Sequence, residues 1–350
     1  MDESVDVVCE KQGEAGLITL NRPKALNALN LAMVREMRRA LDAWEQDPSV
    51  TRVIIQGAGE KAFCAGGDIR QLTEDLKAGR REEALAFWRE EYQLNIRIKR
   101  YPKPYISLID GIVMGGGVGV SLHGSHRVAG ERYLFAMPEV GIGFFPDVGA
   151  TYALPRLPGQ TGMYLALTGE RVKRADAVML GLATHSVASE SIPGLREALI
   201  AGEPVEEALS RAAADPGPAP LGAHRGVIDA CFSGESVAAI LQRLDKAAEQ
   251  GSDFAAKTAA GMRAKSPTSM NLAFEQVRRG AALDFEDAMR VEFRIVSRIG
   301  DGHDFYEGVR AVIIDKDNQP RWQPASLEEL DPVVIERHFA SLGERELEIA

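Results

Sequence analysis

The stretch Pro104-Tyr-Ile-Ser-Leu-Ile109 leads, after a short connection, into Met114-Gly-Gly-Gly-Val-Gly119. The apolar run predicts a buried strand, and the glycine cluster predicts the start of a helix. Backbone N–H groups at the start of a helix attract negative charge, and glycine lets a substrate approach them closely. One such N–H group directed at a carbonyl oxygen is half of an oxyanion hole. The same glycines would also permit close packing of a helix on a strand, and this alternative stays open.

Strands and helices alternate around this stretch, which predicts an α/β fold. The clearest helix is Leu31 to Trp44, with apolar residues at helical spacing and Asn30 placed to cap its start. Four further apolar runs are predicted to be strands: Val5 to Val8, Leu17 to Leu20, Val53 to Gln56 and Tyr133 to Phe135. After the segment 215–220, which is rich in proline and glycine, the periodicity is almost entirely helical. We therefore expect an α/β core over residues 1–205 that binds the ligand, and a helical C-terminal region over residues 206–350 that completes the fold.

The composition predicts a soluble globular protein. The chain has 350 residues, of which 45% are hydrophobic, so it can form one large domain or two. Its net charge of −10 argues against nucleic acid as a partner, although a local basic patch could receive a phosphorylated ligand. The longest apolar run, Tyr105 to Leu122, contains Asp110 and five glycines, and we therefore expect no membrane span.

The cysteines and the first residues of the chain bear on its location. Cys9, Cys64 and Cys231 are too few and too scattered for a disulfide framework, which favours a reducing compartment. The segment Met1 to Asp6 is acidic and resembles neither a signal peptide nor a transit peptide. These two observations together predict a cytoplasmic protein.

Two acids, Glu139 and Asp147, lie in the stretch Phe135-Ala-Met-Pro-Glu-Val-Gly-Ile-Gly-Phe-Phe-Pro-Asp-Val-Gly149. A carboxyl group among apolar side chains is costly to ionise, so we expect its pKa to rise. A raised pKa suits a general acid or base near neutral pH. The alternative is that both acids lie at the surface and cap neighbouring turns, which is the usual position of acidic residues.

A second glycine turn lies in Lys61-Ala-Phe-Cys-Ala-Gly-Gly-Asp-Ile69. Gly66 and Gly67 expose backbone amides there, and Asp68 can cap the helix that follows. Taken alone, the segment is most simply a turn. Together with the glycine cluster at Gly115 to Gly117, it could supply the second donor of an oxyanion hole.

Other catalytic motifs do not fit this sequence. It contains neither the dinucleotide-binding pattern G-x-G-x-x-G nor a P-loop ending in Gly-Lys-Ser/Thr. Ser121 would lie inside a helix rather than on a nucleophile elbow. His123 and His126 lack partners at metal-ligand spacing, so no metal site is predicted. Cys64 is best explained as a small buried side chain.

Four segments in this order resemble the crotonase, or enoyl-CoA hydratase/isomerase, superfamily: Thr19 to Ala28, Ala62 to Ile69, Gly115 to Gly117 and Met137 to Glu139. The resemblance implies a spiral of strand-strand-helix units that binds coenzyme A (CoA) thioesters. It also implies that Gly67 and Gly116 donate their N–H groups to the thioester carbonyl oxygen. The residues that it implies along the path of CoA are Lys24, Ala25, Ala65 and Ile69, with Lys24 able to contact a phosphate.

Two positions separate this chain from the hydratases of the superfamily. Gly119 stands where a hydratase has the first of its two catalytic glutamates, and the loss of one acid argues against adding water to a double bond. Asp147 stands where a hydratase commonly has glycine. With aspartate at this position, the chain resembles the 3-hydroxyisobutyryl-CoA hydrolase family, the thioesterases of valine breakdown. The resemblance to that family continues through Lys265 to Ser269, Gly302 to Asp317 and Arg321 to Pro324, nearly to the end of the chain.

The same resemblance implies substrate contacts for Glu91, Gly116, Glu139 and Asp147. Glu139 and Asp147 are the expected catalytic residues, and Glu139 either attacks the carbonyl carbon or deprotonates a water molecule that attacks it. Asp147 is expected to orient Glu139 or to bind the 3-hydroxyl group of the substrate, with assistance from Glu91. The alternative for Glu91 is a solvated charge on a helix.

The expected activity is hydrolysis of a short 3-hydroxyacyl-CoA thioester, with 3-hydroxyisobutyryl-CoA as the leading substrate. We expect no metal and no cofactor, because CoA is part of the substrate. The alternatives are an enoyl-CoA isomerase or hydratase of the same superfamily, or a catalytically silent acyl-CoA-binding protein. The superfamily often assembles as trimers and hexamers, which would give a homo-oligomer, whereas the C-terminal helices could cover the same surface within one chain.

Overall fold

The computed structural model describes residues 5–349, and the chain forms two compact units. The first unit comprises the chain up to Asp68, Glu90–Phe135 and Arg171–Pro220. The second unit comprises Ile69–Arg89, Ala136–Glu170 and the chain from Leu221 onward. The two units are interleaved along the sequence, and the division at residue 205 stays a prediction.

A six-stranded sheet is the larger sheet of the first unit, with the strand order β1-β2-β3-β5-β7-β10. β1 and β2 form an antiparallel hairpin, and the later neighbours in this order are parallel. The strands are β1 (Val7–Gln12), β2 (Ala15–Leu20), β3 (Arg52–Gly57), β5 (Tyr105–Ile109), β7 (His126–Ala129) and β10 (His185–Ser186). Parallel neighbours need long crossover connections, which is why helices alternate with these strands along the chain.

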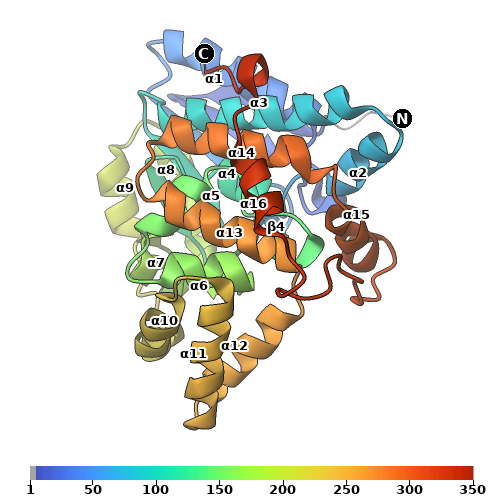
Figure 1. The fold of residues 1–350 in the computed structure, drawn as a ribbon. Coiled ribbons are helices and arrows are strands. Elements are labelled where there is room, and N and C mark those ends of the chain that lie inside the picture. Colours follow the sequence, from blue (N-terminus) through green and yellow to red (C-terminus); the bar gives the residue numbers. More distant parts are fainter. Residues whose placement is uncertain (1–4, 350) are drawn as a thin grey trace. The chain divides into compact units, whose positions relative to one another are not determined.

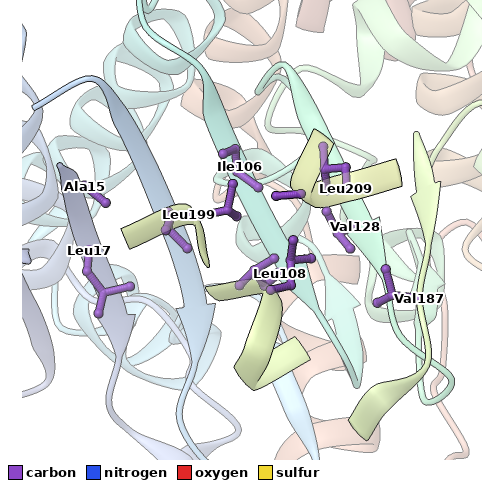
Figure 2. Packing of buried hydrophobic residues seen from close by; sticks show 11 residues of the cluster. Ala15, Leu17, Ile106, Leu108, Val128, Val187, Leu199 and Leu209 are labelled. Atoms are coloured by element: carbon purple, nitrogen blue, oxygen red, sulfur yellow. The ribbon is translucent and has the colours of Figure 1, made fainter. Parts of the chain in front are cut away.

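One face of this sheet is buried under apolar side chains. Side chains two residues apart on a strand point to the same face, so Ile106 and Leu108 of β5 share a face. The helices α8 (Ile192–Ile200) and α9 (Val205–Ala212) contribute Leu195, Leu199, Ala208 and Leu209 to the cluster. Figure 2 shows the side chains packed together: Ala15, Leu17, Ile106, Leu108, Val128, Val187, Leu199 and Leu209. Burial of one leucine side chain contributes about 1.5–3 kcal/mol, so this cluster is a main anchor of the sheet.

The helix predicted over Leu31 to Trp44 is confirmed as α1 (Leu31–Gln46). The Asn30 side chain accepts a hydrogen bond from the backbone N–H of Met33 at 2.9 Å, which satisfies an amide that the first turn leaves unpaired. A Cβ atom added to Gly16 of β2 would lie 2.3 Å from the ring of Trp44. The helix therefore packs directly on the sheet.

A second sheet has the order β4-β6-β8-β9 and consists of β4 (Ala62–Cys64), β6 (Ile112–Met114), β8 (Leu134–Ala136) and β9 (Val172–Lys173). β4 and β6 are parallel neighbours, so their carboxyl ends lie at the same edge of the sheet. The glycine turn at Gly66 and Gly67 follows β4, and the turn at Gly115 follows β6. The topology of this small sheet therefore places the two glycine turns next to each other.

Helices form most of the second unit. Those that lie wholly within its first two segments are α2 (Ile69–Lys77), α5 (Ala150–Ala153) and α6 (Thr161–Thr168). The chain after Leu221 forms α10 (Arg225–Phe232), α11 (Val237–Glu249), α12 (Asp253–Arg263), α13 (Pro267–Gly280), α14 (Phe285–Ile299), α15 (Asp304–Val309) and α16 (Pro332–Phe339). Figure 1 shows α11 and α12 running side by side. These elements confirm the helical C-terminal region.

Three helices remain. α3 (Arg81–Lys99) and α4 (Gly116–Gly119) carry residues of the site, and α7 (Arg174–Leu180) connects β9 to β10. Among residues 5–349, no helix is both long enough and apolar enough to cross a membrane.

Candidate active site

The glycine turn between β6 and α4 has a backbone that only glycine accommodates easily. Gly115 precedes α4 with a φ of 45°, and a Cβ atom added to Gly117 would lie 2.3 Å from the carbonyl oxygen of Cys64. The close-packing explanation of the cluster therefore holds at Gly117. Gly116 is also closely packed, but its neighbours are the Glu91 and Leu29 side chains and the backbone nitrogen of Gly67.

Gly116 lies next to Gly67. A Cβ atom added to Gly116 would lie 3.3 Å from the backbone nitrogen of Gly67. The Gly67 turn is held against Leu29, because the Leu29 N–H group donates to the Gly66 carbonyl oxygen and the Asp68 N–H group donates to the Leu29 carbonyl oxygen, both at 2.9 Å. Two neighbouring glycine amides at the end of a sheet are the arrangement that an oxyanion hole needs.

Glu91 lies beside the same glycine. It is on α3, its exposed fraction is 2%, and its Oε1 atom would lie 2.6 Å from a Cβ atom added to Gly116. Its negative charge adds to burial in raising the pKa of the Cys64 thiol to about 12. A solvated helix charge is therefore the wrong interpretation of Glu91, and Cys64 is a buried thiol rather than a nucleophile.

The residues predicted along the path of CoA begin in a short 3-10 helix, Pro23–Ala25. Lys24 lines a pocket of about 430 Å³ in the first unit, and Lys61 and Glu60 line the same pocket. The Ala65 N–H group donates to the carbonyl oxygen of Leu26 at 3.0 Å, which ties the second glycine turn to this segment. Ile69, the fourth predicted residue, begins α2 of the second unit.

Asn27 supports the wall of this pocket and was not predicted as a site residue. It is fully buried with a φ of 57°, and its side-chain amide donates to the carbonyl oxygens of Ala58 and Ala62, both at 2.9 Å. The Arg22 N–H group donates to its side-chain oxygen at 2.9 Å. Asn27 thus fixes the loop that carries Lys24 to the end of β3 and the start of β4.

Glu139 and Asp147 lie in the second unit and are both buried, with exposed fractions of 6% and 5%. Glu139 begins a 3-10 helix, Glu139–Ile142. Burial, and next the negative charge of Asp147, raise the pKa of the Glu139 carboxyl group well above its ordinary value. Within residues 5–349, the buried Oε2 atom of Glu139 has no hydrogen-bond partner. The interpretation of these acids as surface caps is therefore wrong.

Aromatic side chains cause the burial of this segment. Phe144 stacks on Trp88 with ring centroids 5.9 Å apart, and it also contacts Phe145 at 4.7 Å and Phe305 at 5.2 Å. Water is excluded by such a cluster, and an ionised carboxylate next to it loses hydration energy. Burial in this apolar segment is the larger cause of the raised pKa of Glu139, as predicted, and the charge of Asp147 adds to it.

The C-terminal motifs pack on the same segment. A Cβ atom added to Gly143 would lie 2.0 Å from the carbonyl oxygen of Asp304, so α15 touches the backbone after Glu139. The Ser266 hydroxyl group donates to the Asp304 carboxylate at 2.6 Å, and this links the start of α13 to α15. The matches around Lys265 and Gly302 are therefore structural supports of the Glu139 segment.

Two buried polar residues of the C-terminal helices hold the backbone around Asp147, and sequence reasoning missed both. Glu292 of α14 accepts hydrogen bonds from the N–H groups of Gly149 and Thr151, at 2.8 and 2.9 Å. Gln276 of α13 donates to the hydroxyl oxygen of Thr151 at 2.7 Å and to the carbonyl oxygen of Pro146. The only sequence signal is a polar residue within an apolar helix stripe, as in Val291-Glu-Phe293.

Comparison with known proteins shows the family. The model of the family described as enoyl-CoA hydratase/isomerase matches residues 15–339. The chain is 50% identical over 350 residues to the mitochondrial 3-hydroxyisobutyryl-CoA hydrolase of Xenopus tropicalis, covering 97% of this chain and 90% of the relative. It is 45% identical over 356 residues to the human protein of the same name, covering 99% of this chain and 91% of the relative.

Two solved structures match the whole fold. A structure described as a carnitinyl-CoA dehydratase from Mycobacterium thermoresistibile has a TM-score of 0.93 and 44% identity, covering 98% of each chain. One described as an enoyl-CoA hydratase from Rhodobacter sphaeroides has a TM-score of 0.90 and 40% identity, covering 99% of this chain and 100% of that chain. The predicted crotonase-type fold with a helical C-terminal region is confirmed.

The same comparisons overturn the cytoplasmic location. The relatives from Xenopus and human are described as mitochondrial. The prediction was wrong because unpaired cysteines indicate only a reducing compartment, and the cytoplasm is not the only one. Its second support, the segment Met1 to Asp6, lies mostly outside the described residues.

The family itself is clear from the match over most of the sequence and from the fold: the chain belongs to the enoyl-CoA hydratase/isomerase family.

Proposed function

We propose that this protein hydrolyses 3-hydroxyisobutyryl-CoA to 3-hydroxyisobutyrate and free CoA, a reaction of valine breakdown. The observation that carries the proposal is the pair of exchanges at Gly119 and Asp147. Gly119 ends α4 without a carboxyl group where a hydratase has its first glutamate, whereas Asp147 is buried beside Glu139. The proposal has further support from relatives named for this activity, which are 45–50% identical over nearly the whole chain.

Gly67 and Gly116 are assigned to the carbonyl oxygen of the thioester. Negative charge develops on this oxygen when the carbonyl carbon is attacked, and two preorganised N–H groups stabilise it. Removal of one such donor typically costs about 2.7–4 kcal/mol of transition-state stabilisation. Glu91, buried beside Gly116, would keep the two glycines in place or contact the acyl group.

Glu139 is assigned to the attack on the carbonyl carbon of the thioester, which can follow one of two routes. In the first route its carboxylate attacks the carbonyl carbon, the C–S bond breaks to release the CoA thiolate, and water then cleaves the mixed anhydride. In the second route it takes a proton from a water molecule, and that water forms the bond to carbon as the thiolate leaves. A thiol has a pKa near 8.5, so the thiolate leaves with little assistance in both routes.

A single turnover in ¹⁸O-labelled water gives a positive test for the first route when water cleaves the anhydride at the Glu139 carbonyl. Direct attack by water always places one labelled oxygen in the product acid. Cleavage of the anhydride at the Glu139 carbonyl instead leaves the label on Glu139, where mass spectrometry of the peptide detects it.

Asp147 is assigned to the 3-hydroxyl group of the substrate or to the orientation of Glu139. Lys24 and Lys61 are assigned to a phosphate of CoA, because both line the same pocket of the first unit. Ala25, Ala65 and Ile69 are assigned to the remainder of CoA. The chemistry requires no metal or cofactor beyond the CoA that the substrate carries.

The test of this function is release of free thiol from 3-hydroxyisobutyryl-CoA by the purified protein. Glu139→Gln should lower this release by about 10²–10⁴-fold, because it removes the attacking carboxylate. Binding of the CoA ester to this variant, measured by calorimetry, should remain. A wild-type protein that hydrates crotonyl-CoA or isomerises a 3-enoyl-CoA, and frees no thiol, would contradict the proposal.

A further inference from the structure

The backbone that follows Asp147 adopts a conformation that its sequence does not favour. Val148 has a φ of 53° and Gly149 has a φ of 92°. A β-branched residue rarely adopts a left-handed conformation, and such a conformation persists only where the surrounding structure holds it. Gly149 is also the N-cap residue of the short helix α5, so its amide is one that no intrahelical carbonyl can satisfy.

Glu292 holds this turn from one side. Its side chain is fully buried, and each carboxylate oxygen takes one backbone amide, from Gly149 and from Thr151. The two bonds fix the direction in which the chain leaves Asp147.

Gln276 holds the turn from the other side of Asp147. It is 1% exposed, and its amide group donates to the carbonyl oxygen of Pro146, the residue before Asp147. It also donates to the Thr151 hydroxyl group, so both residues share one partner. Contact with α13 is direct, because a Cβ atom added to Gly280 would lie 1.9 Å from the Thr151 carbonyl oxygen.

Placing the Glu292 carboxyl group in the core near Asp147 has an electrostatic cost, which argues that Glu292 does more than stabilise the fold. A buried carboxyl group beside another acid is costly to ionise, and an apolar residue of similar size in its place is often neutral or stabilising. Burial, and next the charge of Asp147, raise the pKa of Glu292 to about 8. A residue that lies this close to Asp147 at such a cost has a reason to be there other than packing.

We propose that Glu292 and Gln276 form a clamp that positions the Asp147 carboxylate, and that this clamp sets the preference of the enzyme for acyl groups with a 3-hydroxyl. The inference rests on the proposed function, in which Asp147 meets that hydroxyl. Glu292 and Gln276 are positioning residues, since they act on the substrate through Asp147. A buried polar site that loses its geometry no longer rejects acyl groups without the hydroxyl.

The experiment measures binding rather than turnover. Its two ligands are CoA thioethers in which a methylene group separates the carbonyl from sulfur, one with the 3-hydroxyisobutyryl group and one with the isobutyryl group. Calorimetry gives the ratio of their dissociation constants. We expect the wild type to prefer the hydroxylated ligand, and Glu292→Gln and Gln276→Met to reduce this preference by about tenfold each, the value of one well-formed hydrogen bond.

Asp284→Ala is the matched control. Asp284 is the exposed N-cap of the same helix α14, where its side chain accepts from the Asp287 N–H group at 2.8 Å. This variant should destabilise α14 and leave the ratio of dissociation constants unchanged. A ratio that falls equally in Asp284→Ala would show that only general stability matters, and the clamp would be wrong. An unchanged ratio in Glu292→Gln and Gln276→Met, or no preference in the wild type, would also overturn it.

Val148→Gly provides a second variant if Glu292→Gln does not fold. Glycine accepts the left-handed conformation, so the substitution adds no backbone strain at this position. It makes the backbone after Asp147 more flexible, and the ratio of the two dissociation constants should therefore fall. An unchanged ratio here would contradict the clamp. Thiol release is measured separately, so a wild type that prefers the hydroxylated ligand but frees no thiol would refute the hydrolase function and support the clamp.

Discussion

Asp147 lies close enough to Glu139 for its negative charge to add to burial in raising the pKa of the Glu139 carboxyl group. Both side chains are buried in the second unit, and Glu139 begins a 3-10 helix whose next residues are apolar. A change at Asp147 therefore alters the pKa of Glu139.

The first prediction concerns the pH dependence of activity. Both proposed routes need the ionised form of Glu139, so kcat/KM should fall with decreasing pH through the raised pKa of Glu139. Asp147→Asn removes the like charge and should move this acidic limb to lower pH. The limb should stay above the value of an exposed glutamate, because burial is the larger cause. Thiol-release rates measured with isobutyryl-CoA across the pH range check this, and a limb that stays in place or moves upward would contradict it.

The second prediction concerns stability. Burial raises the pKa of Glu292 from 4.5 to about 8. Between these values the folded state holds more protons than the unfolded state, so the free energy of unfolding should fall as pH rises from about 5 to 8. Glu292→Gln should flatten this decrease, while the change of an exposed acid, Glu190→Gln, should not. Urea unfolding at several pH values gives the comparison. Parallel curves for wild type and Glu292→Gln would refute the shift.

The third prediction tests the pair of glycine amides. In Gly116→Ala the new Cβ atom would lie 2.6 Å from Oε1 of Glu91 and 3.1 Å from Leu29, so the turn or Glu91 must move. We expect kcat to fall about 10²–10³-fold, as when one oxyanion donor is lost.

Gly194→Ala is the control for this substitution. Gly194 lies in α8 of the same unit, and a Cβ atom added there meets nothing within 4 Å. It should leave kcat unchanged and stabilise the helix by about 0.5–1 kcal/mol. Because alanine keeps the backbone N–H group, equal kcat in Gly116→Ala and Gly194→Ala would show that the turn is not displaced, and the expected loss of kcat would be wrong.

The fourth prediction concerns the pocket that Lys24 and Lys61 line. Lys24→Gln and Lys61→Gln should raise KM for the CoA ester, and the increase should be larger at low ionic strength because an exposed charge is screened by salt. The same variants should act normally on the pantetheine thioester, which lacks the nucleotide phosphates. Lys257→Gln, an exposed lysine of α12, is the control. A higher KM for both thioesters would place these lysines near the acyl group instead.

Much of the site followed from local sequence. Apolar runs predicted β1, β2, β3, β5 and β8, and the glycines themselves marked both turns, because a positive φ such as that of Gly115 depends mainly on the residue that adopts it. The close approach of Gly117 to Cys64 depends on the pairing of β4 with β6 and had no local signal. The apolar neighbours of Glu139 predicted its burial for a similar reason, since Phe144 and Phe145 lie close to it in the chain.

Other features had no local signal. Lys61 was not predicted beside Lys24, because their common pocket depends on a loop that Asn27 ties to Ala58 and Ala62. Glu91 remained ambiguous between a solvated charge and a buried contact. Helical spacing places a side chain on a face, and only the packing of that face next to Gly116 shows that it is buried.

Short segments of the sequence were enough to predict the family, the α/β fold and the residues that carry the proposed chemistry, because turns, strands and caps depend on neighbouring residues. The contacts that hold the backbone around Asp147 could not be predicted in this way. Glu292 lies 143 residues from Gly149, and Gln276 lies 130 residues from Pro146. Such contacts form only when distant helices pack, because a polar side chain in an apolar stripe has no defined partner until the folded backbone presents one.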